Sequence, residues 1–522
     1  MKKNFNKIAS LVLAASMMVA MPVSVASTTM VAYAAEQTTY TITIDQNDKD
    51  KGSHTYGAYQ IFAGTLSADG KTLSDITWGS GVDSEKIKDF TFNDKSTAAD
   101  IAKTLTSENA AAFAKAIQDY LSSTATGTAL GTGDLSISGL SAGYYLLKDT
   151  SNPTGSYASE TAFILQLVAD QTVKPKSSVP EHNKKVDDIN DSTGTEEKLQ
   201  DSADYDIGDK VPYTLTTTLG DGMDNYKSYS VAINDKMSKG LTYNNDAKIT
   251  IDDVDVTNNF TFNAGNKDSD GYTTYKWSCN DIKAISGATV KNGSKIIITY
   301  TATLNSDAVI GAAGNPNESW LEYDNNPNES GKGQPGGNTP HDKNIVFTYK
   351  VIVNKVKEDK TALAGAEFTL TKQFKDGSTK TIDTIHFVKN DEGKLVTVSA
   401  NTGKTATTFE FDGLDDGTYV LSETVVPDGY NKIDDQTFTV TADHDKESDD
   451  PILKSLSGDV TSGEITFTPN TTEGSLTSDV ENRPGSALPT TGGMGTTILY
   501  VAGAILVIAG AAVLVIKKRH EA

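Results

Sequence analysis

Three positions near the C-terminal end of the chain combine an amine, a carboxyl group and an amide. Lys355 lies two positions after Val353, so the alternation of a β-strand directs its side chain to the same inner face. Glu423 stands in the same relation to Leu421, and Asn482 follows the last predicted strand of this region. A low-dielectric core disfavours charged forms. A buried lysine is then a neutral nucleophile, and a buried carboxylic acid keeps a proton that it can donate.

The segments around these residues read Asn-Lys-Val, Leu-Ser-Glu-Thr-Val-Val-Pro-Asp-Gly-Tyr and Val-Glu-Asn. They resemble the collagen-adhesin B-type domains, a family that forms a Lys–Asn isopeptide bond spontaneously. The resemblance implies that the Lys355 amine attacks the Asn482 amide while Glu423 protonates its oxygen, and that ammonia leaves. The alternative is a lysine that extends to solvent and an exposed asparagine, the usual fate of each residue alone.

A related set precedes it in the chain. Lys184 or Lys185 opens a predicted strand, Asp235 lies on the inner face of another, and Asn317 or Asn325 offers the amide. We select Lys184, Asp235 as the acid and Asn317 for the second isopeptide bond, with Lys185 and Asn325 as open alternatives.

One internal repeat relates the first and last parts of the chain. The segment 140–149 matches 414–423, with leucine, glycine, tyrosine, leucine and an acid at equivalent places. Asp149 therefore corresponds to Glu423, but its region has no inward lysine on the opening strand and no closing asparagine. We predict the same architecture there without a bond.

Conventional catalysis and cofactor binding find little support. The six histidines are scattered, Cys279 is the only cysteine, and the glycine-rich stretches lack Gly-Lys-Thr or Gly-Lys-Ser. We expect no metal, no cofactor and no enzyme active site for an external substrate. The net charge of −23 argues against a nucleic-acid partner, because phosphate contacts need clustered Lys and Arg.

The two ends of the chain carry export and anchoring signals. Residues 1–34 have basic residues, an apolar stretch and Ala-Tyr-Ala, which is typical of a secretory signal peptide, although its cut site is not fixed. Near the other end an apolar run, 498–516, is long enough to cross a bilayer and is followed by Lys-Lys-Arg. The pentapeptide before this run is Leu488, Pro489, Thr490, Thr491 and Gly492.

This tail resembles the cell-wall sorting signal of Gram-positive surface proteins. The resemblance implies that a sortase cysteine attacks the bond after Thr491, which becomes an acyl-enzyme thioester. The alternative is a tail-anchored protein with a chance pentapeptide. The ordered occurrence of pentapeptide, spacer, apolar run and basic end favours the sorting signal.

Short alternating segments between Gly, Asp and Asn turns predict a mainly β protein of tandem immunoglobulin-like sandwiches, the first with helical insertions. A helix is expected between Ser96 and Leu121, and Ile345–Val353 is expected as the last strand of the second sandwich. The predicted divisions are a signal peptide at 1–34, an N-terminal domain at 35–173, a linker at 174–181, sandwiches at 182–353 and 354–484, and a sorting signal at 485–522.

The linker reads Val173-Lys174-Pro175-Lys176 and resembles the pilin motif, whose usual core is Tyr-Pro-Lys-Asn. The departures at its tyrosine and asparagine leave Lys174 as an alternative to Lys176. With the sandwiches and sorting signal, the exported chain resembles the sortase-assembled major pilins of Gram-positive bacteria.

This resemblance implies a cell-wall surface fibre that serves adhesion and colonisation. Its partners would be a pilin-specific sortase, identical subunits joined from Thr491 to Lys176 of a neighbour, and peptidoglycan through a housekeeping sortase. Minor pilins at the tip or base are further partners to consider. A monomeric wall-anchored adhesin with the same two ends is the alternative.

Overall fold

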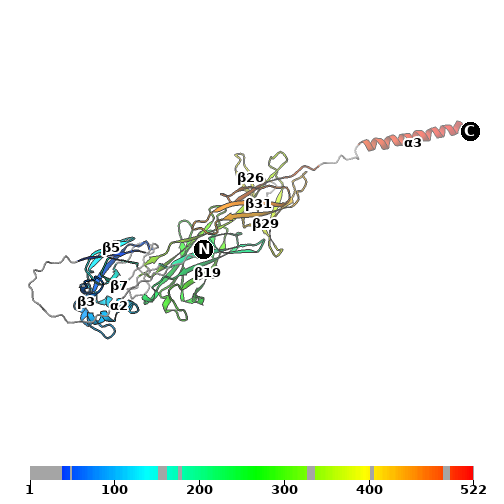
Figure 1. Cartoon of the computed structure of the whole chain (residues 1–522). Helices are drawn as coiled ribbons and strands as arrows, with labels where there is room; N and C mark the ends of the chain where they lie inside the picture. Colours follow the sequence, from blue (N-terminus) through cyan, green and yellow to red (C-terminus); the bar gives the residue numbers. More distant parts are fainter. Residues whose placement is uncertain are drawn as a thin grey trace, which may run out of the picture.

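The computed structural model describes residues 38–46, 50–150, 162–174, 179–325, 336–399, 405–485 and 494–520. Strands dominate these residues and form three consecutive modules, at 40–173, 181–347 and 349–481, which we call the first, second and third modules. The modules follow one another along an elongated molecule, and a single helix, α3, extends from the far end (Figure 1). The predicted fold class, mainly β with stacked sandwiches, is confirmed.

The first module packs two sheets of order β5-β1-β8 and β3-β2-β6-β7, with β4 paired to β2. Its strands are β1 (Tyr40–Ile44), β2 (His54–Leu66), β3 (Leu73–Trp78), β4 (Gly127–Gly131), β5 (Leu135–Leu140), β6 (Gly143–Asp149), β7 (Ala162–Leu167) and β8 (Gln171–Val173). Two helices cover one side, and the buried faces of Phe113 and Ile117 pack against Phe62. The predicted helical insertion is therefore present.

This insertion consists of two helices where one was expected. Thr97 caps α1 (Ala98–Thr104) by accepting a hydrogen bond from the Asp100 backbone, as the sequence predicted for Ser96 or Thr97. The helix ends at Leu105, and α2 (Ala110–Ile117) begins five residues later. Both helices bury apolar side chains, Ile101 in α1 and Phe113 in α2. The apolar positions of the predicted helix are therefore buried although the helix is interrupted.

The second module consists of two larger sheets that face each other across an apolar core. One sheet contains β9 (Glu181–Asn190), β10 (Thr195–Gln200), β12 (Lys210–Thr218), β14 (Leu241–Tyr243), β15 (Lys248–Ile251), β16 (Val254–Asp255) and β19 (Lys295–Leu304). The other contains β11 (Ser202–Asp204), β13 (Val231–Met237), β17 (Thr261–Lys267), β18 (Thr273–Cys279), β20 (Asn315–Tyr323), β21 (Gly337–Asn338) and β22 (Asp342–Phe347).

The third module repeats this arrangement with sheets of order β27-β26-β28-β23-β33-β32 and β25-β24-β29-β30-β31. The first sheet contains β23 (Tyr349–Val356), β26 (Ile385–Lys389), β27 (Leu395–Val398), β28 (Thr408–Leu414), β32 (Thr468–Asn470) and β33 (Ser475–Glu481). The second contains β24 (Glu367–Gln373), β25 (Thr379–Ile382), β29 (Gly417–Val425), β30 (Gln436–His444) and β31 (Leu453–Ser462).

The boundary between these two modules differs from the predicted one. The stretch 345–353, expected as one strand of the second sandwich, is divided at the fully buried Thr348. The part before it, β22, pairs within the second module, whereas β23 pairs with β28 and β33 of the third. Mostly apolar residues flank Thr348 on both sides, so the sequence contains no signal for this change of sheet.

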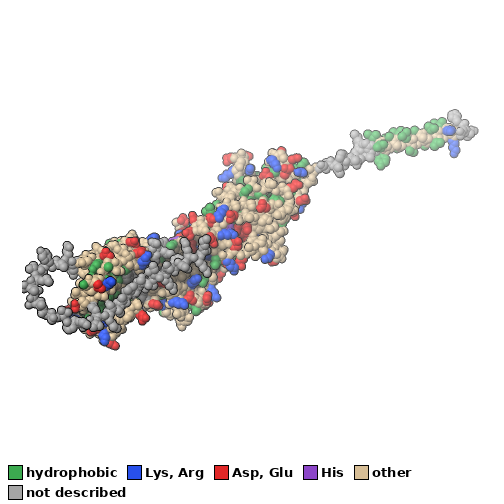
Figure 2. Space-filling model, in the orientation of Figure 1, with side chains coloured by type: hydrophobic (Ala, Val, Ile, Leu, Met, Phe, Trp, Pro, Cys, Tyr) green, Lys and Arg blue, Asp and Glu red, His purple; other side chains and the backbone are tan. Residues whose placement is uncertain are grey.

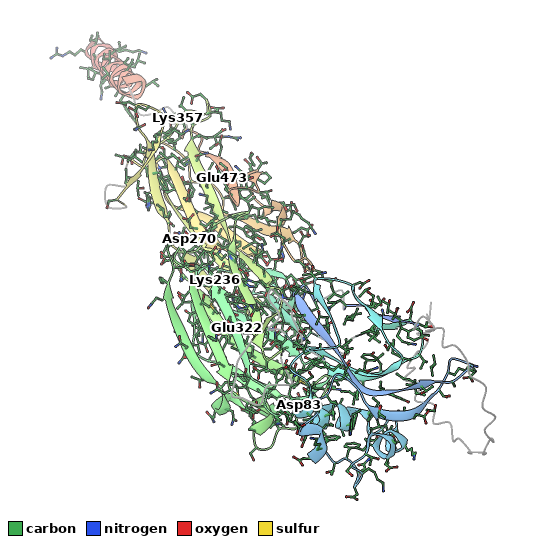
Figure 3. The ribbon with its side chains drawn as sticks, turned by 90° about the vertical axis from the view of Figure 1, so that its left-hand side faces the viewer. Asp83, Lys236, Asp270, Glu322, Lys357 and Glu473 are labelled. Carbon is green, nitrogen blue, oxygen red and sulfur yellow. The ribbon has the colours of Figure 1, made fainter. Side chains whose placement is uncertain are left out.

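Figure 3 shows the modules from another side, with Asp83 on the first module, Glu322 on the second and Glu473 on the third, and in this view the first module lies beside the second. Beyond them, α3 (Met494–His520) contains a 22-residue segment, Ile498–Arg519, that is long and apolar enough to cross a membrane. None of this segment is buried, and its hydrophobic side chains cover the helix surface in Figure 2. All of the predicted signal peptide and all of the sorting pentapeptide lie outside the described residues.

Candidate functional site

The third module brings its predicted amine, acid and amide into one buried site. Lys355 on β23 and Asn482, just after β33, lie at adjacent ends of two parallel neighbouring strands, and the Asn482 backbone donates to the Val356 carbonyl at 3.2 Å. Glu423 reaches them from β29 in the facing sheet, and its carboxylate accepts the Asn482 side-chain amide at 2.8 and 3.1 Å. All three side chains are fully buried.

The electrostatics of this site favour a neutral amine. Burial lowers the pKa of Lys355 to about 8, against the opposing attraction of Glu423 and Glu481. The Lys355 ammonium nitrogen donates to the Val480 carbonyl at 2.9 Å, which fixes it beside the strand that leads to Asn482. The Asn482 side-chain oxygen is buried and has no hydrogen-bond partner among the residues that the structure describes. Rotation of this amide by a half-turn places its oxygen on Glu423, the position that protonation during attack on carbon requires.

The second module holds an equivalent set in a different layout. Lys184 projects from β9 in one sheet, whereas Asp235 on β13 and Asn317 on β20 project from the facing sheet. The Lys184 nitrogen donates to Asp235 at 2.5 Å and to the hydroxyl of Tyr300 at 2.7 Å. The same hydroxyl accepts the Asn317 amide at 2.9 Å and donates to Asp235 at 2.8 Å. Tyr300 therefore forms hydrogen bonds with all three groups: the Lys184 amine, the Asp235 carboxyl group and the Asn317 amide.

Complete burial acts on both ionisable groups of this set. It lowers the pKa of Lys184 despite the charge of Asp235, and it raises the pKa of Asp235 despite the charge of Lys184. Both directions favour the neutral amine and the protonated acid. The rings of Tyr213 and Tyr300 lie 4.6 and 5.3 Å from the Lys184 nitrogen and exclude water from it. This environment suits attack by an amine on an amide in the absence of a base from solvent.

The two alternatives for this set lie elsewhere. Lys185, on the opposite face of β9, forms an ion pair with Asp201 at 2.5 Å, and its side chain is 31% exposed. Asn325 follows the far end of β20, eight positions beyond Asn317, whereas Asp235 pairs with Ser319 near the start of that strand. The geometry favours Lys184 and Asn317.

The first module uses its corresponding acid differently. In the sequence repeat Tyr145 and Tyr419 occupy equivalent places, and each hydroxyl donates to the carbonyl four residues before it, at 2.8 and 2.9 Å. Asp149, the equivalent of Glu423, contacts the imidazole of His54 within hydrogen-bonding reach, and Asp50 lies 3.3 Å from its other ring nitrogen. Burial alone lowers the pKa of His54, but these two carboxylates outweigh it and raise the pKa to about 9.

Of the residues predicted to link one chain to the next, only the alternative lysine, Lys174, lies among the described residues. Lys176 and all five residues of the sorting pentapeptide lie outside the described residues. Lys174, the alternative linkage lysine, forms an ion pair with Asp45 of the first module at 2.7 Å. It follows β8 directly, so the linker leaves the first module at this edge.

Comparison with known protein families gives two matches along the chain. Residues 349–451 match a prealbumin-like fold domain, and residues 484–522 match the LPXTG cell wall anchor motif. The "Trypsin-resistant surface T6 protein" of Streptococcus pyogenes serotype M6 is 26% identical over 420 residues, which cover 67% of this chain and 70% of that protein. The chain therefore carries an LPXTG cell wall anchor motif and is similar to a Gram-positive surface protein.

Two solved structures of pilins are similar over most of their length. The T6 backbone pilin of serotype M6 Streptococcus pyogenes shares 18% identity at a TM-score of 0.49, covering 87% of this chain and all of that one. The full-length major pilin SpaD of Corynebacterium diphtheriae shares 17% identity at a TM-score of 0.45, covering 86% of this chain and 98% of that one.

The chain also has buried functional candidates that the sequence did not reveal. Tyr300 joins the second-module set from β19, but tyrosines are common on inner strand faces and nothing in its neighbourhood marks it. Lys372 is fully buried at the boundary between the second and third modules. The carboxylates of Asp415 and Asp206 outweigh its burial and raise its pKa, so it remains an ammonium.

Proposed function

We propose that this chain is the structural subunit of a covalent surface fibre, and that Lys184–Asn317 and Lys355–Asn482 isopeptide bonds strengthen each copy. The observation that supports the internal bonds most directly is the burial of each amine against a carboxyl group and an amide. Each reaction joins the lysine nitrogen to the side-chain carbon of asparagine, and the amide nitrogen leaves as ammonia. In each module the carboxyl group, Asp235 or Glu423, relays the proton from the amine to the leaving amide nitrogen.

Polymerisation uses the two ends of the chain. A pilin-specific sortase cleaves the bond between Thr491 and Gly492 and holds Thr491 as a thioester on its cysteine. The Lys176 amine of another copy attacks this carbonyl, forms an amide and releases the sortase thiol. One donor and one acceptor on each copy generate an open chain of subunits, which a housekeeping sortase then attaches to peptidoglycan. Adhesion and colonisation are the roles that such a surface fibre would serve.

The test of polymerisation is a gel ladder. We expect the full chain, expressed with its pilin-specific sortase in a Gram-positive host, to give a ladder that survives boiling in detergent. Lys176→Ala reduces it to a single band, whereas Lys174→Ala, two positions away, leaves it intact. A wild-type chain that stays monomeric beside the active sortase contradicts the fibre and favours the wall-anchored adhesin.

The internal bonds are tested by the intact mass of the mature chain. We expect a deficit of about 17 Da, the mass of ammonia, for each bond. Asn317→Ala and Asn482→Ala each abolish one deficit, and Asn325→Ala serves as the matched control that abolishes none. A wild-type mass equal to the sequence mass contradicts both bonds.

A further inference from the structure

The junction between the second and third modules is built without a linker. Only Thr348, fully buried, separates β22 of one module from β23 of the other. Backbone hydrogen bonds cross the junction at several levels, such as Ile207 to the Gly413 carbonyl at 3.0 Å and Asp201 to the Lys446 carbonyl at 2.9 Å. Groups from both modules therefore meet here at fixed separations.

Acidic side chains from both modules converge at this junction. Asp204, at the end of β11 in the second module, meets Asp415 and Asp416 from the turn between β28 and β29 of the third, with one oxygen of each within 4.8 Å of the others. That limit is about twice a calcium–oxygen distance, the largest separation at which two oxygens can share one calcium ion. Asp188 on β9 and His444 on β30 form a second group with Asp204 within the same limit.

Two buried oxygens at this cluster lack hydrogen-bond partners. Asp204 is 2% exposed, and its Oδ2 atom accepts no hydrogen bond within the described residues. The hydroxyl of Tyr349, the first residue of β23, is fully buried and faces the Asp204 carboxylate, but no hydrogen bond of normal geometry joins it to the described residues. Leaving such groups unsatisfied costs free energy, and a cation would satisfy both.

The positive groups nearby do not balance the carboxylates. His444 lies 3.6 Å from both Asp188 and Asp204, too far for a normal hydrogen bond. Lys372 contacts Asp415 at 3.1 Å, but its ammonium is shared with Asp206 at 3.2 Å.

We propose that this junction binds one divalent cation, Ca²⁺, through the carboxylates of Asp204, Asp415 and Asp416. The ligands are hard oxygens in an irregular arrangement, which suits Ca²⁺ better than the strict octahedral geometry of Mg²⁺. Asp188 and the Tyr349 hydroxyl, both beside Asp204, are the next oxygens available to the ion. Because the ligands come from two modules, the site exists only while the modules are docked, and the ion stabilises that docking.

The test is the melting of the mature chain at pH 7.5 after chelation and dialysis, with and without Ca²⁺. We expect an affinity of about 0.1–1 mM, as in other extracellular modules. At about 5 mM, Ca²⁺ then raises the melting temperature of the second and third modules by several degrees, and Mg²⁺ raises it less. A melting temperature that is indifferent to Ca²⁺ overturns the proposal.

Matched variants locate the effect. Asp416→Asn keeps the side-chain size and one oxygen, so we expect the protein to fold and calorimetry to show binding weakened by about tenfold or more. Asp270→Asn, an exposed aspartate of the second module labelled in Figure 3, should bind Ca²⁺ like the wild type. Equal binding by Asp416→Asn and the wild type would place the ion elsewhere and overturn the assignment to this junction.

Discussion

Buried ionisable residues take different roles here because of the charges that surround them. Lys184 and Lys355 each face one predicted acid, and burial lowers the pKa of both amines. Lys372 is buried as deeply but faces several carboxylates, and its pKa is raised. The first two can therefore act as nucleophiles, whereas the third is a fixed positive charge.

We predict that the stability of the first module depends on pH through His54. The folded-state pKa of His54 is about 9, above the ordinary value of 6.5, so its ion pairs with Asp50 and Asp149 stabilise the module fully below pH 6.5. This contribution, on the order of 3 kcal/mol, is lost as pH rises through 9. We expect calorimetry of the mature chain to show the first-module transition falling between pH 6.5 and 9.5.

The His54→Asn variant is the control for this titration. It cannot become protonated, so its first-module transition should be lower than that of the wild type at pH 6.5 and should converge with it above pH 9. Parallel pH profiles for the two proteins would show that His54 does not carry the effect.

The strands explain what the sequence could and could not reveal. Period-two alternation was sufficient to direct Lys355, Glu423 and Asp235 inward, because each lies on a regular strand with apolar neighbours. It could not choose between Asn317 and Asn325, since Pro316 makes the start of β20 resemble a turn. Pro316 is tolerated there because pairing with β13 begins only at Asn317. The ion pairs of His54 with Asp50 and Asp149 depend on how the strands pack, and no local sequence pattern predicts that packing.

We predict that the two neighbouring lysines of β9, Lys184 and Lys185, differ in how much they contribute to stability. Lys184→Met keeps a side chain of similar length but removes the bond between the facing sheets. Closing a loop of more than a hundred residues is worth about 4–5 kcal/mol, so we expect a loss of that order in the free energy of unfolding of the second module. Chemical denaturation of the mature chain measures it.

Lys185→Met removes the partly exposed ion pair with Asp201 from the other face of the same strand. We expect this control to change the stability by about 1 kcal/mol or less. Equal losses for the two variants would mean that the buried amine contributes no more than an ordinary surface lysine.

The elongated succession of modules determines how a fibre carries tension. In the proposed fibre, force enters at Lys176 and leaves at Thr491. The two internal bonds provide a covalent route from Lys184 to Asn317 and from Lys355 to Asn482. The residues inside each closed loop then carry none of the load, and only the stretch 317–355 lies on the route within the folded modules.

This route predicts the extension of a single subunit stretched between residues 176 and 491. The 38 positions from 317 to 355 allow a gain of at most about 130 Å at 3.3–3.6 Å per residue. The double variant Lys184→Met/Lys355→Met releases both loops, and force spectroscopy should then record steps several times longer. Lys185→Met/Lys357→Met is the matched control, and long steps in that protein would contradict the bonded route.

The position of the first module before Lys176 has a consequence for the surface of the fibre. Residues 38–173 would form a side domain at the linkage point, outside the covalent path that joins neighbouring subunits. In the proposed fibre, changes that destabilise this module would not weaken the covalent chain, whereas the second and third modules would depend on their proposed internal bonds. The first module's ionic triad in place of a covalent seal is consistent with that difference.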